Sequence, residues 1–157
     1  MTKEKSYRPN VAAIVLSSKY PLKSEILIAD RIDIQDAAWQ FPQGGIDEGE
    51  SPKEALFREL MEEIGTDEVD ILAEYPEWIS YEFLNKGARK MYPFDGQTQK
   101  YFLVKLKSSA KLNLKTKEPE FIDYQFVSYK EVFEKISKVK KPIYTTVLKY
   151  FRKEGYL

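Results

Sequence analysis

The sequence contains no cysteine and no histidine. The lack of cysteine excludes disulfide bonds, zinc sites built on thiolates and thiol nucleophiles. The lack of histidine excludes imidazole acid–base catalysis and histidine-based metal sites. Any catalysis must therefore rely on carboxylates, Lys, Arg, Ser, Thr, Tyr or a bound cation.

A net charge and a long hydrophobic run are also missing. The chain has 25 basic and 25 acidic residues, so its formal net charge is 0. This balance excludes a protein-wide basic field for nucleic acids but allows a local basic patch. The apolar run at residues 11–16 is far shorter than the ~20 residues that span a bilayer. The first ten residues also lack the apolar core of a signal peptide. We therefore expect a cytoplasmic protein that does not associate with membranes.

The 157 residues, of which 43% are hydrophobic, fit one globular domain spanning residues 1–157. Apolar and β-prone runs predict strands at 11–16, 25–29, 38–41, 71–83, 101–106 and 124–127. We expect helices at 52–64, 129–135 and 142–153, a break in regular structure at 42–45, and a turn-rich excursion at 84–99. Because strands and helices mix without strict βαβ alternation, the fold class is α+β, with a mixed sheet covered by helices.

The helix predicted at 52–64 has clear start and stop signals. Ser51 is a favourable N-cap, Pro52 falls at the first helical position and Glu54 completes a capping box. Gly65 stands where a helix commonly ends in a left-handed conformation. These signals fix the helix at about thirteen residues.

Three glutamates share one face of this helix. At about 100° per residue, Glu59, Glu62 and Glu63 lie within roughly 100° of one another. The opposite side carries an apolar stripe of Leu56, Phe57, Leu60, Met61 and Ile64. Crowded carboxylates repel one another, and hard divalent cations would relieve this because they prefer oxygen ligands. Taken alone, however, the pattern is more typical of a solvated acidic face.

The residues around the helix bear on the choice between a metal site and a solvated acidic face. Gly44 is followed after five residues by Glu50, and after seven more by Arg58-Glu59-Leu60-Met61-Glu62-Glu63-Ile64-Gly65. This spacing resembles the Nudix box, G-x5-E-x7-R-E-U-x-E-E-x-G-U, in which U is a bulky aliphatic residue. Eight of the nine specified positions match, and the ninth is Thr66. A match of this length at fixed spacing favours a metal site over a solvated face.

The resemblance implies a fold and a chemistry. Nudix enzymes hydrolyse a nucleoside diphosphate linked to another moiety, and they fold as an α/β/α sandwich around a mixed sheet. By resemblance, Mg²⁺ or Mn²⁺ would be held by Glu59, Glu62 and Glu63, with the carbonyl of Gly44 as a candidate further ligand. The supporting residues would be Gly45, Glu50, Arg58 and Gly65. Which glutamate acts as the general base stays open.

The similarity extends beyond the box. Residues 7–10, 39–45, 99–102, 119–121 and the Lys140-Lys141 stretch resemble the bacterial RNA pyrophosphohydrolases, also described as dinucleoside polyphosphate hydrolases. That family removes pyrophosphate from triphosphorylated 5′ RNA ends and thereby opens the RNA to decay. The resemblance implies that Glu120 is a further metal ligand or base. It also implies a set of substrate-binding residues: Arg8, Gln97, Gln99, Lys140 and Lys141.

One residue departs from the family. Val139 stands where an aromatic often precedes this lysine, so base stacking is not expected at that point. The basic residues near the C-terminus, among them Lys149 and Arg152, could still contact a nucleic acid backbone. We expect both tryptophans, Trp39 and Trp78, to belong to the core.

Three functions remain as alternatives. The first is a metal-dependent hydrolase of 5′-triphosphorylated RNA, which Arg8 and the C-terminal lysines favour. The second is a hydrolase of dinucleoside polyphosphates such as diadenosine tetra- or pentaphosphate, which would use the same helix. The third is a nucleotide-binding sensor without catalysis, which has no need for all three glutamates. The sequence indicates no particular protein partner.

Overall fold

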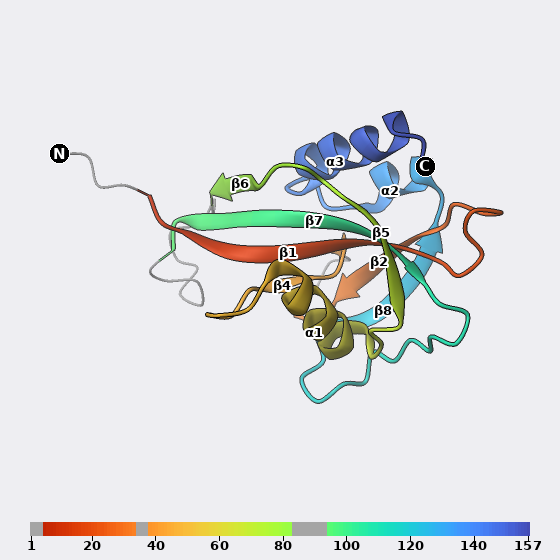
Figure 1. Ribbon diagram of the computed structural model, residues 1–157, viewed down its shortest axis with the longest axis horizontal. Coiled ribbons are helices and arrows are strands. Elements are labelled where there is room, and N and C mark those ends of the chain that lie inside the picture. The colour runs from red at the N-terminus through yellow and green to blue at the C-terminus, as the bar shows by residue number, and fades with distance from the viewer. Residues whose placement is uncertain (1–4, 34–37, 83–93) are drawn as a thin grey trace.

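The computed structural model describes residues 5–33, 38–82 and 94–157 (Figure 1). The strands are β1 (Tyr7–Leu16), β2 (Ile26–Arg31), β3 (Trp39–Gln40), β4 (Gln43–Gly45), β5 (Val69–Glu74), β6 (Ile79–Glu82), β7 (Gly96–Leu106) and β8 (Phe121–Val127). The helices are α1 (Pro52–Ile64), α2 (Tyr129–Lys135) and α3 (Lys141–Lys153). None of the helices in these ranges is long and apolar enough to cross a membrane.

The strands form one mixed sheet in the order β3-β2-β1-β7-β5. β1 runs parallel to β7 along its whole length, which places Arg8 beside Gln97 and Asn10 beside Gln99. The pairings of β1 with β4, of β7 with β6 and of β2 with β8 are antiparallel. The sheet therefore brings polar residues of β1, β4 and β7 side by side at one end.

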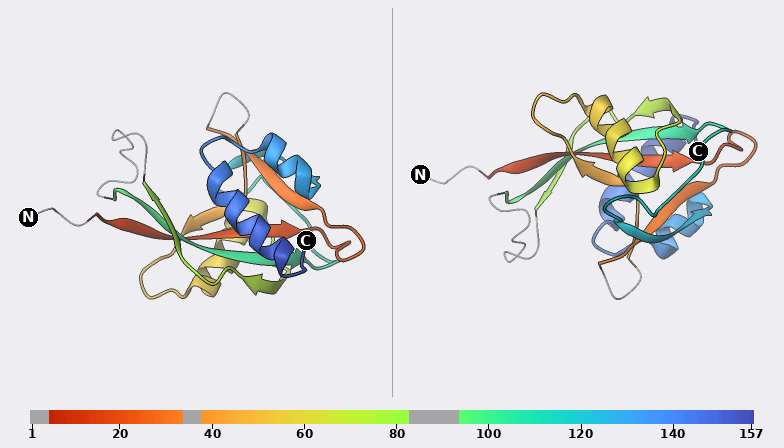
Figure 2. Two further views of the ribbon diagram at one scale, coloured as in Figure 1. Left: turned by 90° about the horizontal axis from the view of Figure 1, so that it is seen from above. Right: turned by 90° about the horizontal axis from the view of Figure 1, so that it is seen from below.

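Two hydrophobic cores lie on opposite faces of the sheet, and β1 contributes to both because its side chains alternate. Ile14 and Leu16 belong to the same buried cluster as Leu148 of α3. Val11, Ala13 and Val15 belong to the second cluster, with Leu56, Leu60 and Ile64 of α1. The views from above and below show α3 and α2 over one face and α1 over the other (Figure 2). The expected α/β/α sandwich with a mixed sheet is confirmed.

The ends of α1 fall at the predicted residues. Ser51 accepts a hydrogen bond from the backbone N–H of Glu54, and the Glu54 side chain accepts one from the backbone of Ser51. Gly65 ends the helix with φ at 75°. Beyond it, the N–H of Asn113 donates to the carbonyl of Ile64 at 2.8 Å. This bond ties the segment between β7 and β8 to the C-terminal end of α1.

Three predictions of extended or irregular structure were wrong in part. Residues 43–45 form β4 instead of a break, since they pair with β1. The stretch 71–83 divides into β5 and β6, and Trp78 between them is 45% exposed instead of lying in the core. The expected excursion at 84–99 ends earlier, because β7 begins at Gly96. The part of it at 84–93 lies outside the described residues.

Replacing Gly65 with alanine should destabilise the fold and disturb the 107–120 segment. A Cβ atom on Gly65 would lie 2.5 Å from the carbonyl oxygen of Asn113, in addition to the unfavourable positive φ. A non-glycine residue at such a φ costs about 1–3 kcal/mol. Gly49→Ala is the matched control, because Gly49 has φ at 80° but nothing within 4 Å of the added atom. Thermal unfolding should show the larger loss for Gly65→Ala, and equal losses would mean that the Asn113 contact is unimportant.

Candidate active site

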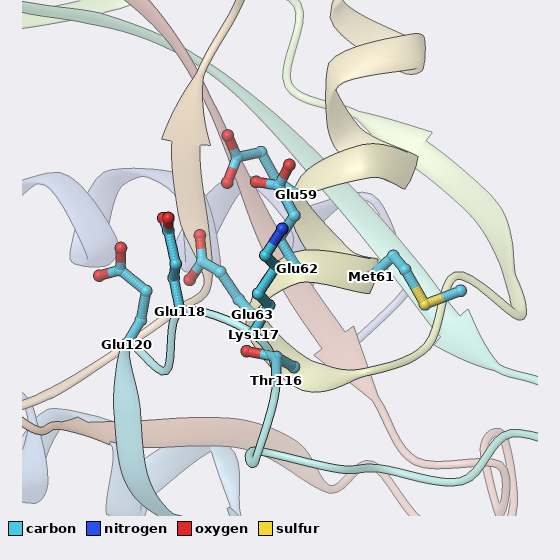
Figure 3. A pocket seen from close by; sticks show the side chains of 8 residues that line it. All are labelled: Glu59, Met61, Glu62, Glu63, Thr116, Lys117, Glu118 and Glu120. Atoms are coloured by element: carbon cyan, nitrogen blue, oxygen red, sulfur yellow. The ribbon is translucent and has the colours of Figure 1, made fainter.

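A pocket of about 440 Å³ lies between α1 and the chain segment that precedes β8. Figure 3 shows side chains from both walls directed into it. Its lining is dominated by acids and comprises Glu59, Met61, Glu62, Glu63, Thr116, Lys117, Glu118 and Glu120. Two stretches more than fifty residues apart in sequence thus form one acidic pocket.

Glu63 is the most buried acid of the pocket, with only 4% of its surface exposed. Burial raises the pKa of Glu63 well above its ordinary value, and the nearby charges of Glu59 and Glu120 raise it further. Burial also raises the pKa of Glu59, against the opposing effect of Arg58. The carboxyl groups of Glu59 and Glu63 lie close enough to interact directly, which adds to the upward shift in the pKa of Glu63. Glu62, whose side chain is 56% exposed, remains open to solvent.

Arg58 forms hydrogen bonds with several acidic side chains near the pocket. Its guanidinium donates two hydrogen bonds of 2.8 Å to the carboxylate of Glu50 and another to the carbonyl of Gly45. It also donates to Glu59 at 2.9 Å, whereas its contacts with Glu62 are longer, at 3.3 and 3.4 Å. The side-chain bonds from Arg58 lower the pKa of Glu50 to about 2. Arg58 therefore fixes Glu59 much more than Glu62, which lies one helical turn further along α1.

The two glycines of β4 make room for charged side chains. A Cβ atom on Gly44 would lie 1.9 Å from the carboxyl carbon of Glu59. A Cβ atom on Gly45 would lie 2.2 Å from a guanidinium nitrogen of Arg8. A side chain at Gly44 would therefore displace the carboxylate of Glu59, and one at Gly45 would displace the guanidinium of Arg8.

A second group of polar side chains lies beside β4. Lys140 donates a hydrogen bond of 2.8 Å to the hydroxyl of Tyr81, and its ammonium lies 4.4 Å from the centre of that ring. The Tyr81 hydroxyl donates to Gln97 at 2.6 Å. Burial lowers the pKa of Lys140 to about 8 and raises the pKa of Tyr81 to about 12. A partly desolvated cation therefore stands at the start of α3.

Gln43 links this group to the acidic pocket. Its side-chain oxygen accepts hydrogen bonds from Gln99 at 2.6 Å and from Lys140 at 3.4 Å. Its backbone is hydrogen bonded to Glu63. Gln99 is fully buried and is held in turn by Asn10 and Tyr101. The strand β4 thus connects the carboxylates of α1 with the cation of α3.

The five glutamates that line the pocket suit a hard divalent cation, because such cations prefer carboxylate oxygens as ligands. Among residues 5–33, 38–82 and 94–157, no three acidic groups stand close enough together to hold a metal ion in the conformation seen. The side chains of Glu59 and Glu63 are the two that already lie close together. Glu62 and Glu120 are exposed at the rim, so their side chains have room to turn inward.

Most of the residues predicted from the sequence gather around α1 and β4. Glu59, Glu62, Glu63 and Glu120 line the pocket, and Gly44 lies against Glu59. The substrate-binding candidates Gln97, Gln99 and Lys140 share one hydrogen-bond network with Gln43 and Tyr81, and Arg8 lies over Gly45.

The exposure of three other residues could not be predicted reliably from the sequence. Lys141 is exposed at the first turn of α3 and has no side-chain hydrogen bond or ion pair with the described residues. Met61, assigned to the apolar stripe, is 47% exposed at the rim of the pocket. Thr66 fits the aliphatic position of the motif because it is buried and its hydroxyl accepts a bond from the N–H of Glu68.

Sequence reasoning did not identify the second wall of the pocket beyond Glu120. Thr116, Lys117 and Glu118 also line it. They lie in a segment without helix or strand periodicity, so no pattern marked them. The proximity of Pro119-Glu120 to this stretch was the one signal that could have drawn attention to it.

Comparison with known proteins gives consistent matches. The NUDIX domain model matches residues 6–147. An RNA pyrophosphohydrolase of a Nitratiruptor species is 67% identical over 153 residues, covering 98% of both chains. The RNA pyrophosphohydrolase of Campylobacter jejuni subsp. jejuni is 66% identical over 157 residues, covering 100% of both.

A solved structure shows the same fold at much lower identity. The dihydroneopterin triphosphate pyrophosphohydrolase of E. coli superposes with a TM-score of 0.68 at 17% identity. The match covers 87% of this chain and 92% of that one. At this identity the likeness concerns the sandwich architecture alone.

Proposed function

Because the chain belongs to the Nudix hydrolase family, we propose that it is an RNA pyrophosphohydrolase that converts 5′-triphosphate ends of RNA to 5′-monophosphate ends. The observation that carries the proposal is the identity of 66–67%, over essentially the full length, with relatives that bear this name. In this proposal residues 1–157 act as one domain in the cytoplasm, where such RNA ends would be exposed to decay.

The pocket would hold the triphosphate. Nudix hydrolases generally use divalent cations, and Glu59, Glu62, Glu63 and Glu120 would hold Mg²⁺ or Mn²⁺ here, with the carbonyl of Gly44 as a candidate further ligand. Such a cation supplies positive charge against the phosphate oxygens. Arg58 keeps the carboxylate of Glu59 in a fixed position through their 2.9 Å bond.

The reaction is a hydrolysis of one anhydride bond. The oxygen of a water molecule bonds to the phosphorus nearest the RNA, and the bond from that phosphorus to the bridging oxygen breaks. Pyrophosphate leaves with the bridging oxygen, and a carboxylate of the pocket takes the proton of the attacking water. The candidates for this base are Glu59, Glu62, Glu63 and Glu120.

The RNA would be held next to the acids by the network around β4. Lys140 and Arg8 are cations at this end of the sheet. The buried side chains of Gln97 and Gln99 would position Tyr81 and Gln43 beside the RNA through their hydrogen bonds. Cations that approach a nucleic acid backbone stabilise the complex by releasing counterions. The exposed Val139 adds no aromatic platform, so affinity would depend on charge and hydrogen bonds.

Substrate comparison tests this proposal. Equal concentrations of 5′-triphosphorylated RNA and of diadenosine tetraphosphate are incubated with the protein and Mg²⁺, with EDTA as control. We expect faster turnover of the RNA, loss of turnover in EDTA, and pyrophosphate as the fragment identified by mass spectrometry. Preference for the dinucleoside polyphosphate would instead assign a small-nucleotide hydrolase. Binding of either substrate without turnover would assign a sensor.

A further inference from the structure

The acidic pocket contains one cation among its lining residues, and neither the motif nor the resemblance assigns it a role. Lys117 lines the pocket together with the five glutamates 59, 62, 63, 118 and 120. In Figure 3 it extends from the same segment as Glu118 and Glu120, and its ammonium is drawn next to the side chains of Glu59 and Glu62. The pocket therefore has carboxylates on both walls, and its positive charge comes from the wall formed by residues 116–120.

Lys117 is not held as a counter-ion of these acids. Within the described ranges, no carboxylate lies within ion-pair distance of its ammonium. Arg58, by contrast, forms ion pairs with four carboxylates, those of Asp47, Glu50, Glu59 and Glu62. The residue is also exposed, so its side chain remains available to a ligand. An unpaired ammonium beside a cluster of carboxylates can bind an anion that enters the pocket.

The wall that carries Lys117 is fixed relative to α1. The N–H of Asn113 donates to the carbonyl of Ile64 at 2.8 Å, immediately after Glu63. The backbone of Asn113 also packs against Gly65, where an added Cβ would lie 2.5 Å from its oxygen. The segment that carries Lys117 is therefore anchored to the C-terminal end of α1 four residues before the lysine.

Thr116, the residue before Lys117, gives a separate indication that the pocket holds a ligand. Thr116 lines the same pocket, and its hydroxyl oxygen is buried without a hydrogen-bond partner among the described residues. Buried polar atoms without partners are rare and destabilising, so a small movement that let this hydroxyl reach a ligand in the pocket would be favourable. Thr116 and Lys117 thus offer a hydroxyl donor and a cation side by side.

We propose that Lys117 is a positioning residue that binds the phosphate chain of the substrate from the wall opposite α1, assisted by the hydroxyl of Thr116. This inference rests on the proposed function, because it takes a polyphosphate as the ligand of the pocket. The carboxylates of α1 would hold a divalent cation that supplies positive charge to the substrate, while Lys117 contacts non-bridging phosphate oxygens directly. The two walls thereby fix the phosphate chain from both sides.

Binding measurements separate this role from general RNA affinity. The probes are an RNA whose 5′-triphosphate has a methylene group in place of the bridging oxygen between the α and β phosphates, and the same RNA with a 5′-monophosphate. In Mg²⁺, Lys117→Gln should weaken binding of the triphosphate analogue about tenfold, as expected for loss of a hydrogen bond to a charged group. Binding of the monophosphate RNA should change less than twofold.

Lys115→Gln is the matched control, because Lys115 is exposed on the same segment and does not line the pocket. It should leave both affinities unchanged, and Lys117→Arg should retain most of the preference for the triphosphate. In turnover assays Lys117→Gln should raise KM for triphosphorylated RNA more than it lowers kcat. Thermal unfolding of all three variants should match that of the wild type.

Three outcomes would overturn the inference. Lys117→Gln could bind the triphosphate analogue as tightly as the wild type, or it could weaken both RNAs equally, as a general backbone contact would. It could also tighten Mg²⁺ binding while the ratio of the two RNA affinities stays unchanged, which would make Lys117 only a counter-ion. Failure of the proposed function is distinct, because the wild-type protein itself would then not discriminate between the two RNAs.

Discussion

Glu63→Gln should abolish hydrolysis and stabilise the metal-free protein. Glu63 is 4% exposed, and its carboxyl group contacts that of Glu59. Gln has the same shape and can donate its amide hydrogen to Glu59, so it removes a buried charge while keeping the hydrogen bond. It also removes a ligand of the divalent cation, so kcat should fall on the order of 10³-fold.

The gain in stability should depend on pH. Burial raises the pKa of Glu63 above its ordinary value of 4.5, so the unfolded chain loses this proton before the folded protein does. Below pH 4.5 the carboxyl group is protonated in both states and the substitution changes little. As pH rises from 4.5 through the raised pKa, the wild type loses stability and the variant does not. Above that range the variant should be the more stable of the two proteins.

Thermal unfolding with and without Mg²⁺ measures both effects. Added Mg²⁺ should raise the Tm of the wild type, since it binds the folded state only, and should raise that of Glu63→Gln much less. Glu62→Gln is the matched comparison, because the Glu62 side chain is 56% exposed. It should lose activity without the gain in stability. Full activity of Glu63→Gln would show that this carboxylate is not part of the catalytic site.

Gly44→Ala should reduce activity about 100-fold while leaving the fold intact. The added Cβ would lie 1.9 Å from the carboxyl carbon of Glu59, so that carboxylate must swing away. The backbone of Gly44 is not in the left-handed region, so the substitution adds no backbone strain there. A displacement of about 1 Å in a catalytic group can lower the rate by 10²-fold.

Steady-state kinetics at varied Mg²⁺ concentration checks this expectation. Gly44→Ala should lower kcat and raise the Mg²⁺ concentration needed for half-maximal rate. Gly45→Ala provides the contrast, because its Cβ would meet the guanidinium of Arg8 instead. That variant should mainly raise KM for RNA. If Gly44→Ala kept its activity within twofold of the wild type, the position of Glu59 would be unimportant for catalysis.

Local sequence signals were sufficient for α1. The capping box of Ser51 and Glu54 and the terminal Gly65 depend on residues within one turn of the helix, so their effect can be recognised without the rest of the chain. The face that carries the three glutamates also follows from helix geometry. Sequence alone could not show that Glu63 is buried, since that depends on how β4 and the 107–120 segment pack against α1.

Features that depend on contacts between residues far apart in the sequence were harder to predict. β4 has only three residues, and its partner β1 lies about thirty residues earlier, so Gln43–Gly45 resembles a turn in sequence. Gln97 and Gln99 fall in the expected irregular excursion, although parallel pairing with Arg8 and Asn10 holds them in β7. Lys117 and Thr116 reach the pocket through a bond from Asn113 to the end of α1, which no local pattern encodes.

The central claim is that the glutamates of α1 hold a divalent cation against a phosphate anhydride. Crystals grown with Mn²⁺ and measured at the manganese absorption edge test it most directly. We predict an anomalous difference peak within coordination distance of the carboxylates of Glu59 and Glu63. A map with no peak in the pocket between α1 and Glu120, at a Mn²⁺ concentration that supports turnover, would contradict the account.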